Sequence, residues 1–239
     1  PAKVALLHDY ESQWIYDVQP HSARASYVRQ TMLFYTALRS LGVDVDIRHP
    51  DHDLSGYAVI VAPAIQLMGA ERAAHLASYA DTTRLVFGPR TAYRTPTGRV
   101  QEDGQPGPLR TLVGQRLLNF DGMRPGLHVH AGGFEVETWA ESYEPIDADV
   151  VMTYDDGPLA GKAAVTRKGN AISIGAWSAP LIVSILEQVL AESGVPTAHL
   201  ADGVRRSTRG STEIWMNWSQ TAQVLPDGSE IGPVSFQFR

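Results

Sequence analysis

The chain has 239 residues, of which 44% are hydrophobic and 19% are charged, enough for one main domain and a smaller annex. Its net charge of −6 and its scattered arginines form no basic stripe, so nucleic acid is not an expected partner. The absence of cysteine excludes a disulfide framework, a thiolate metal site and a cysteine nucleophile. No apolar run approaches the length of a membrane span, so we expect a cytoplasmic protein with no membrane partner.

The first part of the chain alternates between apolar strands and amphipathic helices. Residues 58–62 are continuously apolar, as in a central parallel strand, whereas residues 43–47 alternate apolar and acidic side chains, as in an edge strand. The predicted elements are strands at residues 3–7, 43–47, 58–62 and 84–87 and helices at residues 26–41 and 70–80. Their order predicts an α/β fold with a doubly wound, mainly parallel sheet.

Residues 88–107 follow the last of these strands and show neither helical nor strand periodicity. Loops of this length are uncommon in compact domains and are usually functional or disordered. The segment carries Arg90, Arg94 and Arg99 without a nucleophile or a base. This composition favours docking over chemistry.

Further strands and one helix complete the main domain, and a different pattern follows it. We predict strands at residues 134–141, 150–154, 162–168 and 171–175 and a helix at residues 179–193. The rest of the chain is β-rich, with runs at residues 214–218 and 234–238 and no helical pattern. We therefore divide the chain into a domain at residues 1–196 and a small antiparallel β module at residues 197–239. The module is too short to hold a core alone and should pack against a neighbour.

Reactive side chains of α/β folds usually follow the carboxyl ends of parallel strands. Here the first strand is followed by His8, Asp9, Glu11 and Trp14, and the fourth by Arg90. No dinucleotide motif, phosphate-binding loop or serine elbow follows a strand, so we predict no cofactor and no catalysis by this chain alone. A stand-alone hydrolase would have to use His8 as its base.

Two histidine groups have spacing that suits a metal. His128 and His130 share one face if they lie on a strand, and a polar turn holds a second group, His49, Asp51, His52 and Asp53. Either group would need a further ligand to hold zinc. Solvated surface histidines are the commoner interpretation, so we predict no metal site.

Three runs of sequence together resemble a known family. They are VALLHDYESQWIYDVQP at residues 4–20, FYTALRSLGVDVDIRHPDHDLSGYAVIVAP at residues 34–63 and LVFGPRTAYRT at residues 85–95. This ordered set is similar to the region that follows the catalytic barrel in family 42 glycoside hydrolases, the bacterial β-galactosidases. Further along, GNAISIGAW resembles the end of that middle domain and IWMNWS the small C-terminal β domain.

The resemblance implies a fold and an assembly role. In the family this region forms an amidotransferase-like sheet that lacks the nucleophilic cysteine and mediates trimer formation. The two catalytic glutamates of these retaining enzymes lie on the barrel, and no residue here matches them. We therefore expect a non-catalytic trimerisation and C-terminal region of a β-galactosidase. Its expected partners are copies of itself and the barrel of the same or a neighbouring subunit.

The resemblance also suggests which residues face a neighbouring subunit. We hypothesise that Asp9, Glu11, Trp14 and Arg90 form this surface. Arg90 would hold the carboxylate of Asp9 or Glu11 in its planar fork. A simpler interpretation is that the four residues only close the edge of the sheet.

The alternative function is a carbohydrate-binding or ligand-sensing module on the same fold, with galactosides as ligands. Such a module should present a concave site lined by Trp14 and neighbouring aromatic side chains within one chain. An assembly module should instead leave this surface flat or covered by another subunit.

Overall fold

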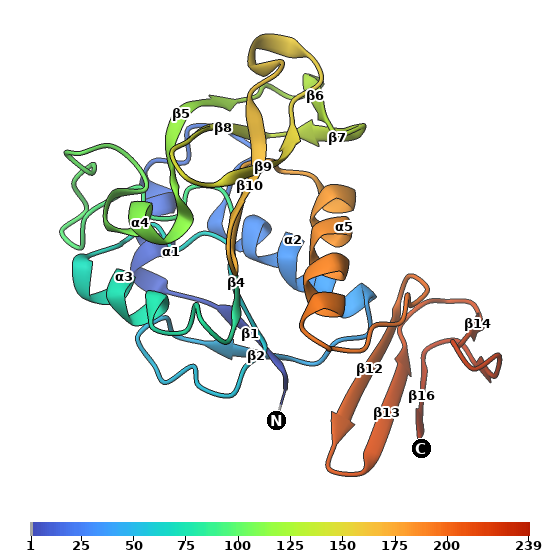
Figure 1. The fold of residues 1–239 in the computed structure, drawn as a ribbon. Coiled ribbons are helices and arrows are strands. Elements are labelled where there is room, and N and C mark those ends of the chain that lie inside the picture. The colour runs from blue at the N-terminus through green and yellow to red at the C-terminus, as the bar shows by residue number, and fades with distance from the viewer. Residues whose placement is uncertain (1) are drawn as a thin grey trace.

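The computed structural model describes residues 2–239, which fold around one mixed sheet of nine strands (Figure 1). The strand order is β2-β1-β3-β4-β11-β10-β8-β5, and β9 pairs with β10. The parallel strands are β1 (Val4–Leu7), β2 (Val45–Arg48), β3 (Val59–Ala62), β4 (Arg84–Phe87) and β11 (Ala171–Ile174). The antiparallel strands are β5 (Gln115–Gly122), β8 (Trp139–Pro145), β9 (Asp149–Thr153) and β10 (Ala163–Lys168). The predicted α/β fold with a mainly parallel central sheet is confirmed, and β2 lies at the sheet edge.

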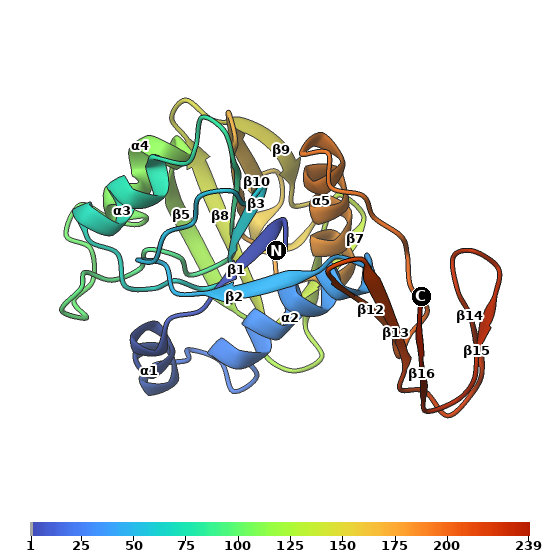
Figure 2. The same cartoon turned by 90° about the horizontal axis from the view of Figure 1, so that it is seen from below.

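Helices cover both faces of the sheet, as Figure 2 shows. α2 and α5 pack on one face, and α3 and α4 pack on the other with η1. Their bounds are α2 (Tyr27–Ser40), α3 (Ala70–Ala77), α4 (Arg110–Val113) and α5 (Ala179–Glu192), with two short 3-10 turns, η1 (Gly107–Leu109) and η2 (Gly157–Leu159). None of the helices within residues 2–239 has both the length and the apolar character needed to cross a bilayer.

Two elements lie where we expected irregular chain. The residues that follow β1 form a helix, α1 (Tyr10–Val18), rather than the predicted loop. β5 pairs with β8 along the outer edge of the sheet, in a stretch for which we predicted no strand. Both elements matter below because each contributes to one side of the candidate site.

A second difference concerns the strand that we predicted at residues 134–141. It is divided into β7 (Phe134–Glu137) and β8 because Thr138 adopts a left-handed backbone conformation with φ of 66°. β7 pairs with β6 (His128–Ala131) in a separate hairpin. The two turn residues of this hairpin are Gly132 and Gly133, whose φ values of 55° and 81° suit a tight turn of that kind.

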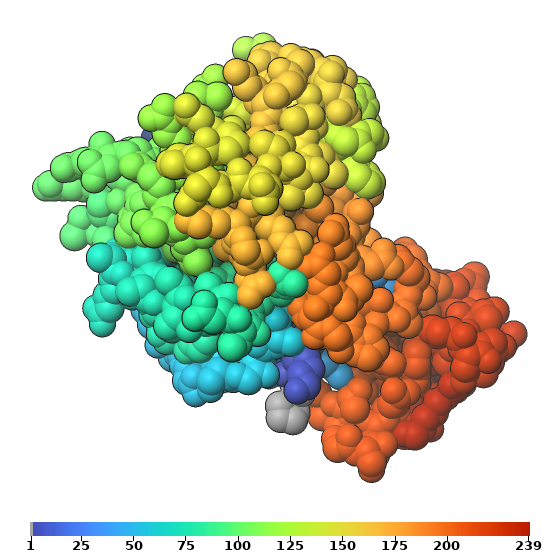
Figure 3. All heavy atoms as spheres, viewed as in Figure 1, coloured from blue at the N-terminus to red at the C-terminus, as the bar shows by residue number. Residues whose placement is uncertain are grey.

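The C-terminal strands form a lobe beside the main domain, coloured orange to red in Figure 3. Its sheet contains β12 (Val204–Arg209), β13 (Thr212–Asn217) and β16 (Ser235–Phe238), all antiparallel, and β14 (Gln223–Val224) pairs with β15 (Glu230–Ile231). Four buried side chains form its small core: Val204, Trp215, Leu225 and Ile231. The predicted antiparallel module is therefore present.

Several hydrogen bonds attach the module to the end of α2 and the chain that follows it, and a buried arginine on α2 makes two of them. The Arg39 guanidinium donates hydrogen bonds to the carbonyl oxygen of Val43 (2.6 Å), to the carbonyl oxygen of Arg206 and to the Ser207 hydroxyl (3.0 Å). Asp44 receives both the Arg39 guanidinium (3.1 Å) and the backbone N–H of Thr208 (2.8 Å). The expectation that the module packs against its neighbour is thus confirmed.

Candidate functional site

The strand order places a crevice beside the carboxyl ends of β1 and β3. In open α/β sheets of order 2-1-3-4-5, ligands bind where the direction of winding reverses, which is between the first and third strands. β2-β1-β3-β4-β11 follows this order. The segments that leave β1 and β3 at this edge carry Asp9 and Leu67, respectively. The side chains at this edge are therefore the first candidates for a ligand-binding site.

Asp9 is fully buried and has two basic neighbours. Its Oδ2 accepts hydrogen bonds from the Ser12 hydroxyl (2.6 Å) and from Arg72 Nη1 (3.0 Å), and its Oδ1 lies 3.5 Å from His49 Nε2. Burial alone raises the pKa of Asp9, but hydrogen bonds from Ser12 and the charge of Arg72 outweigh it and hold that pKa below its ordinary value. The same Asp9 carboxylate raises the pKa of the neighbouring Glu11.

An open polar cleft of about 660 Å³ lies beside these residues. Its polar lining comes from Glu11, His49, Asp51, Glu71, Arg72 and His75. The ligand atoms of Asp9, Glu11 and His49 lie within 4.8 Å of one another, which would allow a cation between them. The Arg72 guanidinium beside Asp9 opposes that cation by direct charge repulsion.

Arg90 is also buried, with 1% of its surface exposed, but it serves a different element. Its guanidinium donates to the carbonyl oxygens of Gln19 (2.8 Å) and Pro20 (2.9 Å), just beyond the carboxyl end of α1. Its Cζ lies 3.7 Å from the ring centroid of Tyr16, a residue of the same helix. Arg90 therefore fixes α1 against the sheet.

The predicted ion pair between Arg90 and the carboxylate of Asp9 or Glu11 is therefore wrong. The reason is that Arg72 occupies the basic position beside Asp9, while Arg90 reaches in the other direction toward the end of α1. Arg90 also has a left-handed backbone with φ of 63°. That conformation turns the chain sharply after β4 and directs the side chain inward.

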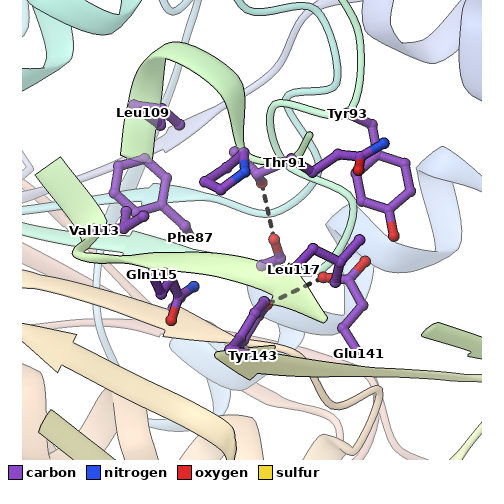
Figure 4. A pocket seen from close by; sticks show the side chains of 13 residues that line it. Phe87, Thr91, Tyr93, Leu109, Val113, Gln115, Leu117, Glu141 and Tyr143 are labelled. Carbon is purple, nitrogen blue, oxygen red and sulfur yellow. Dashed lines mark hydrogen bonds between the residues drawn. The ribbon is translucent and has the colours of Figure 1, made fainter. Parts of the chain in front are cut away.

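Beneath Arg90 lies a buried carboxylate that sequence reasoning missed, that of Glu141 on β8. Its Oε1 accepts hydrogen bonds from the backbone N–H of Arg90 (2.8 Å) and from Trp139 Nε1 (2.9 Å). Its Oε2 accepts one from the Tyr143 hydroxyl (3.1 Å), drawn in Figure 4. The signal in the sequence is the alternation of Trp139, Glu141 and Tyr143 along one face of a strand.

The cavity between this carboxylate and the chain after β4 is very small. Figure 4 shows that side chains of β4, β5 and β8 and of the loop between β4 and α4 enclose it. Its volume is about 20 Å³, which is room for about one water molecule. A sugar ring does not fit there.

The pH dependence of stability follows from the position of Glu141. Burial raises the pKa of Glu141, so the folded protein holds this proton more tightly than the unfolded chain. The contribution of the protonated Glu141 to the free energy of unfolding is complete at acid pH. It is lost as the pH rises through the pKa that Glu141 has in the folded protein. The non-titrating Glu141→Gln variant is less stable than the wild type, and we expect this difference to become smaller as the pH rises from about 4 to about 7. Urea melts at both pH values check this, and a constant difference would contradict it.

Glu11 and Trp14 lie on the exposed part of α1. Tyr10, Trp14 and Val18 are four residues apart and form one apolar stripe along the outer face of this helix, with 64%, 63% and 81% of their surfaces exposed. The opposite face is buried through Ser12 and Tyr16. Of the four predicted site residues, Asp9 and Arg90 are therefore internal, whereas Glu11 and Trp14 reach the surface.

Comparison with known proteins covers nearly all of the chain. Residues 2–196 match the family described as the β-galactosidase trimerisation domain. The sequence is 35% identical over 232 residues to a β-galactosidase of Thermus thermophilus, and 34% identical over 257 residues to β-galactosidase Bga of Halorubrum lacusprofundi. The chain spans 35% and 36% of the lengths of these relatives.

Solved structures agree with the sequence relatives. The crystal structure of a β-galactosidase from the psychrophilic Marinomonas ef1 is 27% identical, with a TM-score of 0.91 over 99% of this chain and 37% of that chain. A polyextremophilic β-galactosidase from the haloarchaeon Halorubrum lacusprofundi is 32% identical, with a TM-score of 0.94 over 100% of this chain and 39% of that chain. The chain belongs to the β-galactosidase trimerisation domain family of the family 42 glycoside hydrolases.

Proposed function

We propose that this chain is a non-catalytic assembly region of a family 42 β-galactosidase that hydrolyses terminal β-galactosides. Residues 1–196 would form the trimerisation domain and residues 197–239 the small C-terminal domain. In this proposal the outer face of α1 contacts an adjacent subunit, whose catalytic barrel lies across that contact. Membership of the trimerisation family supports the assembly role.

The observation that carries the proposal is the apolar stripe of Tyr10, Trp14 and Val18. The helix α1 buries Ser12 and Tyr16 and exposes two aromatic rings and a valine. A surface helix usually does the opposite, because its apolar side chains face the core and its polar side chains face solvent. Aromatic side chains that are exposed together are enriched in protein interfaces. Arg90 supports the same role, because it holds α1 rigidly in place.

The geometry favours assembly over the carbohydrate-binding alternative. Trp14 lines neither the polar cleft beside Glu11 nor the small cavity under Arg90. Its ring lies instead on a convex helix surface. A sugar site built on Trp14 would need a concave wall around the ring.

Self-association of the chain tests the proposal. Without a barrel across the contact, we expect the exposed stripe to drive weak association at high protein concentration. Trp14→Ser should weaken the association constant by about tenfold, because a central aromatic anchor is removed. Sedimentation equilibrium up to millimolar protein measures this constant.

Trp218→Ser is the matched control, because Trp218 is 66% exposed on the C-terminal module. Its association constant should stay within the error of the wild type. A chain that remains strictly monomeric at millimolar concentration would contradict the assembly role. An association that Trp14→Ser and Trp218→Ser affect equally would reject the contact through α1.

A further inference from the structure

The hairpin of β6 and β7 brings together metal-ligating side chains that are separate in the sequence. In its register His128 lies opposite Glu137 and His130 opposite Glu135, so all four side chains share the outer face. Val129 and Val136 occupy the inner face, where Val136 is fully buried. Packing of the buried Val136 and the half-buried Val129 therefore fixes which face carries the histidines.

Three of these side chains can reach one ion. The ligand atoms of His128, His130 and Glu135 lie within 4.8 Å of one another. Glu137 is occupied by an ion pair with Arg24 (2.8 Å), which leaves Glu135 as the third ligand. Cross-strand pairing thus supplies the carboxylate that the spacing of the two histidines alone did not provide.

Asp156 prepares His130 for this role. Its carboxylate accepts hydrogen bonds from His130 Nδ1 (2.7 Å) and from the backbone N–H of His130 (2.8 Å). A carboxylate can only accept, so Nδ1 carries a proton, and Nε2 is the ring nitrogen that can bind a metal when the imidazole is neutral. Metal-binding histidines are commonly oriented by such a carboxylate.

We propose that His128, His130 and Glu135 bind a zinc ion, with Asp156 as the residue that orients His130. Two imidazoles and one carboxylate form a donor set that suits Zn²⁺ and leaves a fourth tetrahedral position for water. Zinc at about 2 Å from each donor would hold them roughly 3.3 Å apart. Small rotations of the exposed His128 and Glu135 side chains can close the present spacing.

The second cluster, Asp9, Glu11 and His49, is the weaker candidate. The guanidinium of Arg72 lies 3.0 Å from Asp9 and already neutralises it. In contrast, the groups facing the hairpin cluster from the next loop are Asp155 and Asp156, both acidic. Their negative charge favours a cation at the hairpin.

Zinc titration of the complete chain tests the proposal. By isothermal titration calorimetry with zinc chloride, we expect one ion per chain. His128→Ala and Glu135→Gln should each weaken binding by at least about tenfold, because each removes a ligand. Asp156→Asn should weaken it by roughly 10- to 100-fold although Asp156 does not touch the ion.

Asp155→Asn is the matched control, because the Asp155 side chain accepts the N–H groups of Gly132 (3.2 Å) and Gly133 (2.7 Å) and makes no hydrogen bond to either histidine ring. It removes the same charge without changing a partner of His130 Nδ1, so it should weaken zinc binding clearly less than Asp156→Asn does. Chemical shifts of the His128 and His130 ring protons should move on zinc addition. Absence of zinc binding, or binding lost in His49→Ala but retained in His128→Ala, would overturn the proposal.

Discussion

Replacing Glu141 with alanine is expected to lower the free energy of unfolding by about 3–5 kcal/mol. The substitution leaves three buried donors without an acceptor: the backbone N–H of Arg90, the indole N–H of Trp139 and the Tyr143 hydroxyl. Each orphaned buried donor costs about 1–3 kcal/mol, and removal of a costly buried carboxylate offsets part of the sum. Urea denaturation followed by tryptophan fluorescence measures the change.

Glu141→Gln is the control for this result, because its amide oxygen still accepts from Arg90 and Trp139. We expect it to cost about 1–2 kcal/mol at neutral pH, clearly less than alanine. If alanine and glutamine lower stability equally, the donors are not held by this side chain as described.

Arg90→Lys is expected to lower the free energy of unfolding by about 1–3 kcal/mol. A lysine can neither reach both carbonyl oxygens with a planar fork nor stack flat on Tyr16. A loss of this size is typical when a buried charged donor keeps only some of its hydrogen-bond acceptors. Urea melts of the full chain measure it.

Arg99→Lys serves as the control, because Arg99 is an exposed residue of the same loop. It should change stability by less than about 0.5 kcal/mol, as ordinary surface substitutions do. Equal small effects at both positions would show that Arg90 does not fix α1. The lysine variant should also increase proteolysis within α1, because its carboxyl end would lose its two hydrogen bonds.

The parallel half of the sheet could be predicted because its strands are buried on both faces. β1, β3 and β4 are almost entirely inaccessible to solvent, so their sequences are short uninterrupted apolar runs. α2 was equally readable, since Ser26 caps it through the Arg29 N–H (3.1 Å) and apolar side chains repeat at helical spacing. For these elements, the burial pattern and the local capping residues predict the same secondary structure that the chain adopts.

α1 could not be found in this way because its periodicity is inverted. The buried positions are Ser12 and Tyr16, while the apolar stripe faces solvent. A search for a buried apolar face therefore rejects the helix. The spacing of Tyr10, Trp14 and Val18 by four residues was the available signal.

Thr138 shows a second reason why an element could not be predicted from the sequence. A left-handed threonine is rare, so residue type gave no reason to divide the strand there. The neighbouring hairpin, by contrast, had a signal in the Gly132-Gly133 pair, which is typical of two-residue hairpin turns. Recognising it would have placed Glu135 opposite His130 from sequence alone.

For the candidate site, the residue types in the sequence indicated where the site lies, but they did not indicate which side chains form ion pairs or hydrogen bonds with one another. Asp9 and Arg90 both lie at the expected edge, yet each binds a different partner. The partner of Asp9 is Arg72 on α3, and long-range pairing of this kind depends on how helices pack rather than on local pattern.

The attachment of the C-terminal module has a consequence for motion between the two lobes. One side chain, Arg39, donates to β12 on one side and to the Val43 carbonyl oxygen, which lies just beyond its own helix, on the other. A rotation that separated the lobes would deprive this buried guanidinium of its acceptors on β12, which costs free energy. We therefore expect the module to keep its position relative to α2 for as long as these hydrogen bonds are intact.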